Sequence, residues 1–149
     1  MRRLHLTALA GVLAVSGCAA VRGVQVPAPT PSTAAARLCA ALRLPATLNG
    51  EKRRTTSPSS PYTAAWGSPA IALRCGVPVP AHPASEWIVT IDGVDWLPQP
   101  IDHPVTYTAL HRQAQVEVTI PAAYTKDHPA GDILIGLTSL IKAAIPADS

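Results

Sequence analysis

The chain has 149 residues, a length that predicts one domain of ordinary size with its own hydrophobic core. Hydrophobic residues make up 48% of the sequence and charged residues 14%, which is typical of a folded domain, while 16 prolines indicate extended stretches. The formal net charge is +3, but ten basic and nine acidic side chains remain once Arg2 and Arg3 are assigned to a leader. Because no basic stripe is left, we expect no nucleic-acid partner.

The N-terminus has the features of an export signal that ends at a cysteine. Arg2 and Arg3 precede an apolar run from residue 4 to about residue 15, which is shorter than the roughly 20 residues that a membrane-spanning helix needs. The sequence "VSGC" that follows, ending at Cys18, resembles the lipobox of bacterial lipoproteins, in which an aliphatic residue and two small residues precede a cysteine.

The lipobox resemblance implies that diacylglycerol is joined to the Cys18 sulfur and that residues 1–17 are removed as a lipoprotein signal peptide. Two or more acyl chains hold a protein stably on a bilayer, whereas one chain binds only marginally. We therefore expect the protein on the extracytoplasmic face of the cell membrane, with the membrane as a partner through the lipid anchor. The alternative is a chance cysteine beside an ordinary cleavage site, which would give a secreted protein.

Residues 18–31 are predicted to be the lipidated cysteine followed by a proline-rich tether, "AAVRGVQVPAPTP". A proline-rich chain extends by about 3.1 Å per residue, so this tether could hold the rest of the protein as much as roughly 40 Å from the bilayer. Residues 32–149 are then expected to form a single globular domain.

The two remaining cysteines, Cys39 and Cys75, are predicted to form a disulfide. Export places them in an oxidising compartment, and setting Cys18 aside leaves an even pair. Two separately buried free cysteines are the alternative. A zinc site is less favoured, because neither thiol has a second Cys or His at the spacing of a zinc finger.

The globular part begins with a predicted helix and a predicted loop. Ser32 is a typical N-cap, strong helix formers follow it, and Pro45 stops the helix. The next stretch, residues 47–61, is rich in turn formers and is expected to be an exposed loop. It contains the basic cluster Lys52, Arg53 and Arg54, which could contact anionic lipid head groups or wall polymers; the alternative is a solvated loop without a specific role.

The middle of the chain changes from helical to alternating periodicity, which predicts strands. The predicted strands are "YTAAWG" (62–67), "AIALRCG" (70–76), "EWIVTI" (86–91), "VDWL" (94–97), "VTYTAL" (105–110) and "QVEVTI" (115–120). The "DG" at residues 92–93 suits a tight hairpin turn. Pro98 and Pro100 indicate that the strand before them ends there or lies at an edge of the sheet.

Two further patterns concern which residues face the core. In the strand at 115–120, Val116, Val118 and Ile120 are expected to point inward and the residues between them outward, so that one sheet face is wet or only partly covered. The segment 133–145 has an apolar stripe at helical spacing and predicts a closing amphipathic helix.

Together these elements predict an α+β fold with two layers. An antiparallel sheet of four to six strands packs against an N-terminal and a C-terminal helix, and one disulfide fastens the first helix to a strand.

The sequence contains no motif that predicts catalysis, a cofactor or a metal. Ser68 has a glycine before it but a proline after it, so it is not in a nucleophile elbow. Asp92 and Asp95 could be taken for a glycosidase pair, but they fall at a predicted turn, where aspartate is favoured for local hydrogen bonds. We therefore assign no catalytic, cofactor-binding or metal-ligating residue.

The histidines and tryptophans give no stronger signal. No histidine has a partner at the spacing of a metal-binding pair, so solvated loop positions are expected for His82, His103, His111 and His128. Trp87 and Trp96 could form an aromatic platform for a sugar or peptide, but alternating strands more often place such residues in the core.

Four features in a fixed order resemble a known family. They are Cys39, "SPYTAAWGSPAIALRCGVP" (60–78), "GVDWL" (93–97) and "VEVTIPAAY" (116–124). Over residues from about 37 to 145 the chain resembles the domain of unknown function 3515 family of actinobacterial lipoproteins and secreted proteins. The resemblance implies an exported cell-envelope protein; it implies no reaction, and it carries over no catalytic residue.

Three functions are compatible with these features. The first is a lipid-anchored, non-enzymatic envelope protein that binds or supports a cell-wall component or another envelope protein. The second is an envelope hydrolase with dispersed catalytic residues, and the third is a carrier of a small apolar ligand. An apolar pocket lined by Trp or Tyr favours the carrier, converging ionisable groups with shifted pKa values favour the hydrolase, and an exposed apolar patch favours a protein partner.

Overall fold

The computed structural model describes residues 23–81, 87–99 and 104–148. Its elements, in chain order, are β1 (Val24–Gln25), α1 (Thr33–Ala41), β2 (Thr47–Leu48), β3 (Glu51–Arg54), β4 (Thr56–Ser57), β5 (Thr63–Trp66), β6 (Ile71–Val77), β7 (Val89–Ile91), β8 (Val94–Gln99), β9 (Val105–Ala109), β10 (Gln115–Ile120), the short 3₁₀ helix η2 (Ala122–Tyr124) and α2 (Gly131–Ala144).

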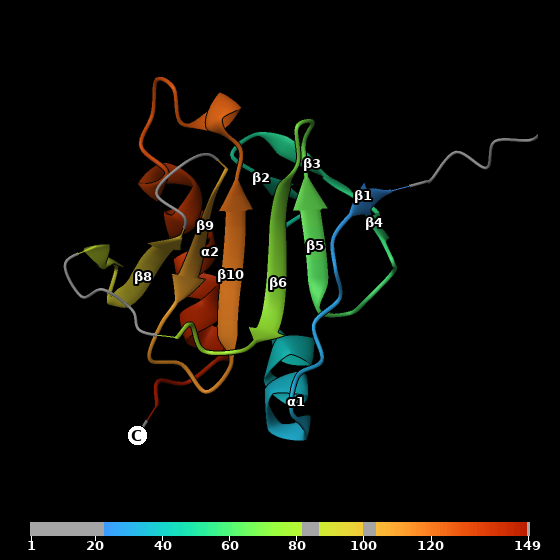
Figure 1. Ribbon diagram of the computed structural model, residues 1–149, viewed down its shortest axis with the longest axis vertical. Helices are drawn as coiled ribbons and strands as arrows, with labels where there is room; N and C mark the ends of the chain where they lie inside the picture. Colours follow the sequence, from blue (N-terminus) through green and yellow to red (C-terminus); the bar gives the residue numbers. More distant parts are fainter. Residues whose placement is uncertain (1–22, 82–86, 100–103, 149) are drawn as a thin grey trace, which may run out of the picture.

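One antiparallel sheet dominates the fold. Its eight strands lie in the order β2-β3-β5-β6-β10-β9-β8-β7, and β1 and β4 form a separate parallel pair. Figure 1 shows α2 behind β9 and β10, and α1 below the lower ends of β5 and β6. The α+β class with a mostly antiparallel sheet is therefore confirmed.

Two details of the predicted architecture are wrong. The large sheet has eight strands rather than four to six, because β2 and β3 form within the stretch that was predicted to be a loop. The helices also do not form one layer on the sheet, because α2 lies along it while α1 lies at its end (Figure 1). From there α1 contacts both β6 and α2.

The extra strands flank a hairpin turn within the stretch predicted to be a loop. Asn49 and Gly50 both have positive φ, +51° and +79°, and they connect β2 to β3 with Leu48 opposite Glu51. This is the geometry of a two-residue hairpin turn, for which Asn-Gly is strongly preferred. The basic cluster therefore lies on a strand of the sheet and not in a loop.

The start of α1 and the buried stripe of α2 follow from their sequences. The Oγ of Ser32 accepts a hydrogen bond from the amide of Ala35 at 3.2 Å, which confirms the predicted N-cap of α1. The helix ends at Ala41, before Pro45 is reached. In α2 the buried stripe consists of Ile133, Leu134, Leu137, Thr138 and Ile141.

The hydrophobic core lies between the sheet, α2 and the inner side of α1. Trp66 and Trp96 are its largest members, and both are fully buried. The inward positions predicted for β10 are confirmed, since Val116, Val118 and Ile120 are also fully buried. Gln115, predicted to point outward, is instead buried and donates its side-chain N–H to the carbonyl of Arg112 at 2.8 Å.

The opposite face of the sheet is polar and only half buried, as predicted. Arg74 on β6 forms an ion pair with Glu117 on β10, with 2.7 Å between Nη1 and Oε1. The hydroxyl groups of Thr106 and Thr119 lie 2.7 Å apart on neighbouring strands. Cross-strand pairs of this kind stabilise a sheet face that is open to water.

Pro98 lies where β8 has a strand neighbour on one side alone. The amide of Leu110 donates to the carbonyl of Asp95 at 2.8 Å, so the odd-numbered residues of β8 direct their backbone groups toward β9. On the other side β7 extends no further along β8 than Trp96. The nitrogen of Pro98 therefore faces no strand within the described residues, and its missing N–H breaks no bond of the sheet.

Part of the predicted tether packs against the fold. The amide of Val24 donates to the carbonyl of Thr55 at 2.8 Å, and the amide of Val26 donates to that of Ser57 at 3.1 Å. Val26 is buried, and so is Pro29. Residues 23–31 are thus extended, as their prolines predict, but they are fixed along the edge of the domain (Figure 1).

Candidate functional site

Several residues singled out from the sequence lie outside the described residues. They are Cys18, the predicted lipid attachment site, and His82 and His103. Within the described part of the chain, no helix is long and apolar enough to cross a membrane.

The predicted disulfide is present between Cys39 on α1 and Cys75 on β6. The two Sγ atoms are bonded, and the Cα atoms lie 5.7 Å apart. Both residues are buried in the core, so the bond joins α1, the helix at the end of the sheet, to the central strand β6.

Asp92 and Asp95 serve the hairpin between β7 and β8, as the turn interpretation predicted. Asp92 and Gly93 have φ angles of +46° and +74°, typical of a two-residue hairpin turn. Asp95 lies on β8 opposite Thr90 of β7, and its Oδ1 accepts a hydrogen bond of 2.6 Å from the hydroxyl of Thr90.

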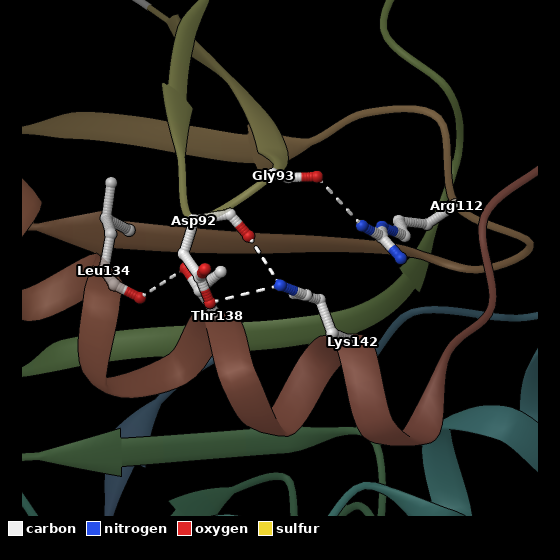
Figure 2. Close-up of polar contacts among 6 residues, drawn as sticks. All are labelled: Asp92, Gly93, Arg112, Leu134, Thr138 and Lys142. Atoms are coloured by element: carbon white, nitrogen blue, oxygen red, sulfur yellow. Dashed lines mark hydrogen bonds and ion pairs between the residues drawn. The ribbon is translucent and has the colours of Figure 1, made fainter.

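Two cations fasten this hairpin turn to the C-terminal part of the chain (Figure 2). The Nζ of Lys142 on α2 donates to the main-chain oxygen of Asp92 at 2.8 Å and to its Oδ2 at 3.2 Å. Arg112 donates to the carbonyls of Gly93 and Ile145, both at 3.3 Å. We call these contacts the hairpin clamp; they connect the turn between β7 and β8 to α2 and to Ile145 directly after it.

Thr138 is the buried polar side chain of α2 that faces this region. Its hydroxyl donates to the carbonyl of Leu134 at 2.9 Å, one turn earlier in the same helix (Figure 2). This bond satisfies the hydroxyl without a partner from the sheet.

The other candidates for chemistry do not converge among the described residues. The Nε2 of His111 lies 4.0 Å from Asp95, and its side chain is 72% exposed in a turn where its own φ is +54°. His128 and Ser68 are exposed on separate loops. In the part of the chain that the structure describes, no three His, Cys, Asp or Glu side chains are grouped as metal ligands.

The basic cluster on β3 is exposed, but two of its members have partners. The guanidinium of Arg53 lies 4.9 Å from the ring centroid of Trp66, and partial burial there lowers the pKa of Arg53. Arg54 donates to the carbonyl of Gly67 at 2.9 Å. Lys52 is exposed on the same strand.

An apolar groove lies between β7 and the start of α2. The cavity has a volume of about 300 Å³ and is lined by Val89, Ile91, Tyr107, Pro129, Ala130, Gly131 and Leu134. Partial burial raises the pKa of the Tyr107 hydroxyl above its ordinary value. We call this site the β7 groove.

Exposed apolar side chains lie at the start of β7, where Val89 lines the β7 groove and Trp87 precedes the strand by two residues. Trp87 is 49% exposed and Val89 is 50% exposed. The core position predicted for Trp87 is therefore wrong, because β7 is the last strand of the sheet and is short, so its outer end is not covered by the described residues. Trp96, by contrast, is in the core as predicted.

Two other cavities are less distinctive. One, of about 400 Å³, lies between the helices and is lined by Ala41, Arg43, Leu140, Ala143 and Ala144. Another, of about 300 Å³, lies where residues 30–35 pass the end of β6. Neither has an aromatic lining, whereas the β7 groove is lined by Tyr107 and by β7, the last strand of the sheet among the described residues.

The fold and its sites define a small disulfide-bonded α+β protein with an apolar groove at one sheet edge and basic side chains at the other. The chain belongs to the family described as protein of unknown function (DUF3515), whose model matches residues 4–149, as the sequence resemblance indicated. No curated protein and no solved structure matches the chain.

Proposed function

We propose that this protein is exported, anchored by lipid at Cys18 on the outer face of the cell membrane, and binds another envelope protein through the β7 groove. The sequence "VSGC" at residues 15–18 supports the anchor. The bond between Cys39 and Cys75 supports export, because structural disulfides persist mainly in oxidising compartments.

The observation that carries the binding role is the combination of an edge strand with exposed apolar side chains. In the described residues β7 has a strand neighbour on one side alone, so the other side presents unpaired backbone groups. An extended peptide can add to such an edge while an apolar side chain enters the adjacent cavity. The hairpin clamp supports this role, because it fixes the strand before a partner arrives.

A photo-reactive amino acid placed at Trp87 tests the binding role in intact cells. We expect a crosslinked product that is lost when Val89→Asp is added. Val79 offers a matched control, because it is 63% exposed and lies outside the β7 groove. Loss of the product with Val79→Asp as well, or no effect of Val89→Asp, would contradict the proposal.

The cavity volume favours a small apolar ligand as the second candidate function. About 300 Å³ lies at the lower end of the range for ligand pockets, and the lining is apolar apart from one tyrosine hydroxyl. An apolar fluorescent probe added to the purified protein should then brighten on binding. Ala130→Phe, which fills the cavity, should abolish that signal; unchanged fluorescence would count against a carrier.

A further inference from the structure

Charge is divided unevenly between the two halves of the sheet. Residues 23–77 contain six basic and one acidic side chain, whereas residues 78–149 contain three basic and eight acidic. The first segment supplies β2, β3, β5 and β6, and the second, the acidic half of the chain, supplies β10, β9, β8 and β7. The basic cluster of β3 therefore lies in one half of the sheet, and Asp95 and Glu117 lie on strands of the other half.

The chain enters the fold at the basic edge. A Cβ at Gly23 would lie 3.0 Å from the carbonyl oxygen of Thr55, and the amide of Val24 is bonded to that same oxygen. Thr55 directly follows the basic cluster of β3. Figure 1 shows β1 and β4 together on one side of the sheet, with β8 on the opposite side.

The distance between the anchor and this edge is short. Five residue steps separate Cys18 from Gly23, and a fully extended chain covers at most about 3.6 Å per step, or roughly 18 Å. A tether that ran freely to residue 31 would reach about twice as far, but residues 24–26 are fixed against β4.

The cations at this edge are available to a surface. Lys52, Arg53 and Arg54 are all exposed, and alternation along β3 places Lys52 and Arg54 on the same side of the strand. Arg53, on the other side, lies over the Trp66 ring, and Arg54 donates to the Gly67 carbonyl, so Lys52 is the member without a side-chain partner among the described residues. The nearest acidic residue in the chain, Glu51, is half buried and lies close to Tyr124 and Gly67. Thr55 beyond the cluster is uncharged and exposed.

We propose that the basic edge formed by Lys52, Arg53 and Arg54 lies against the anionic head groups of the membrane, so that the β7 groove at the opposite edge of the sheet points away from the bilayer. This orientation rests on the proposed anchor at Cys18. Attraction of the cluster and repulsion of the acidic half act in the same direction, and the short tether holds the cluster within reach of the lipid surface.

Vesicle sedimentation tests the contact independently of the anchor. The chain from residue 18 onward, carrying Cys18→Ser and therefore no lipid, is mixed at low salt with vesicles of phosphatidylglycerol or of phosphatidylcholine. We expect binding to phosphatidylglycerol alone, and its loss in 0.5 M salt, because dissolved ions screen charge attraction.

Two charge reversals locate the contact. Each basic residue near an anionic surface raises the partition coefficient of the protein onto the vesicles roughly fivefold. Lys52→Glu replaces an attractive charge with a repulsive one, so it should lower this coefficient on the order of twentyfold. Lys126→Glu makes the same change in net charge at an exposed position in the acidic half of the chain, and it should lower partition less than threefold. Lys52 has no side-chain partner among the described residues, so the fold should survive its replacement, which circular dichroism checks.

Several results would overturn the orientation. They are equal losses with Lys52→Glu and Lys126→Glu, binding to both lipids alike, or Lys52-dependent binding to peptidoglycan fragments without binding to phosphatidylglycerol. None of these results bears on lipid attachment, since the tested chain has no lipid. Conversely, absence of lipid on Cys18 in cells would remove the proposed anchor. The vesicle result would then still describe how the basic edge of the protein binds anionic lipid.

Discussion

Gly76 and Pro31 touch closely where the N-terminal segment crosses β6. A Cβ added to Gly76 would lie 2.5 Å from the Cβ of Pro31, and Gly76 itself has a φ of +83°. Glycine is therefore required at this position for two reasons, the backbone conformation and the space that the segment occupies.

Gly76→Ala should displace the N-terminal segment. We expect a loss of about 2–4 kcal/mol in the free energy of unfolding, because a left-handed alanine and a steric clash add together. Gly50→Ala is the matched control: its φ is +79° but nothing lies within 4 Å, so about 1 kcal/mol is expected. Urea unfolding measures both, and proteinase K should cut residues 23–31 faster in Gly76→Ala alone. Equal effects of the two variants would mean that the segment is not packed in solution.

Reduction of the bond between Cys39 and Cys75 should destabilise the protein substantially. The bond closes a loop with a sequence separation of 36, which corresponds to about 4 kcal/mol on the chain-entropy account. Urea unfolding with and without reductant measures this difference. The intact mass should rise by two hydrogens on reduction, and an unchanged mass would show that the thiols are free.

Lys142→Met should loosen the β7–β8 turn with little effect on global stability. Lys142 is bonded to Asp92 at the surface, and exposed ion pairs of this kind contribute less than about 1 kcal/mol. Hydrogen exchange of the β7 amides should nevertheless become faster, because one half of the hairpin clamp is lost. Lys126→Met, outside the clamp, should leave these amides unchanged. Slow exchange in both variants would mean that Arg112 alone fixes the turn.

Tyr107 should ionise at a higher pH than an ordinary tyrosine. Burial raises its pKa above 10.0, so the folded protein keeps this proton at a pH where the unfolded chain has lost it. The stability that comes from this difference is fully present below the unfolded pKa and is lost as the pH rises through the folded pKa. The phenolate absorbance of the wild type, compared with that of Tyr107→Phe, isolates this titration; a midpoint at or below 10 would contradict burial in the β7 groove.

The parts of the fold that could be predicted are those in which local sequence and burial agree. Val116, Val118 and Ile120 alternate cleanly and lie in the core. Cys39 and Cys75 were paired by elimination among three cysteines and are bonded. The "DG" turn at residues 92–93 forms the expected hairpin between two strands.

The errors come from segments whose structure is decided by distant partners. Lys52, Arg53 and Arg54 give no alternation, yet β3 forms because Arg53 and Arg54 pair with Trp66 and Ala65 on β5. The "NG" at residues 49–50 is the sequence signal that indicates the hairpin of β2 and β3. Trp87 has the periodicity of a core residue, but it precedes the last strand of the sheet. The order of strands in a sheet cannot be predicted from the local sequence pattern.

The candidate site was less predictable than the fold. The β7 groove joins Tyr107 on β9 to Leu134 on α2 and Val89 on β7, and these elements meet through packing that no spacing along the chain indicates. The division of charge between residues 23–77 and 78–149 was visible in the sequence, but its meaning depended on which strands are neighbours.

Intact mass spectrometry of the protein extracted from cell membranes tests the central proposal, the lipid anchor, most directly. We expect a chain that begins at Cys18 and carries the added mass of at least a diacylglycerol group. Cys18→Ser should prevent this processing and release the protein from lipid attachment. A wild-type chain with the uncut leader, or one cut without any lipid on Cys18, would contradict the account.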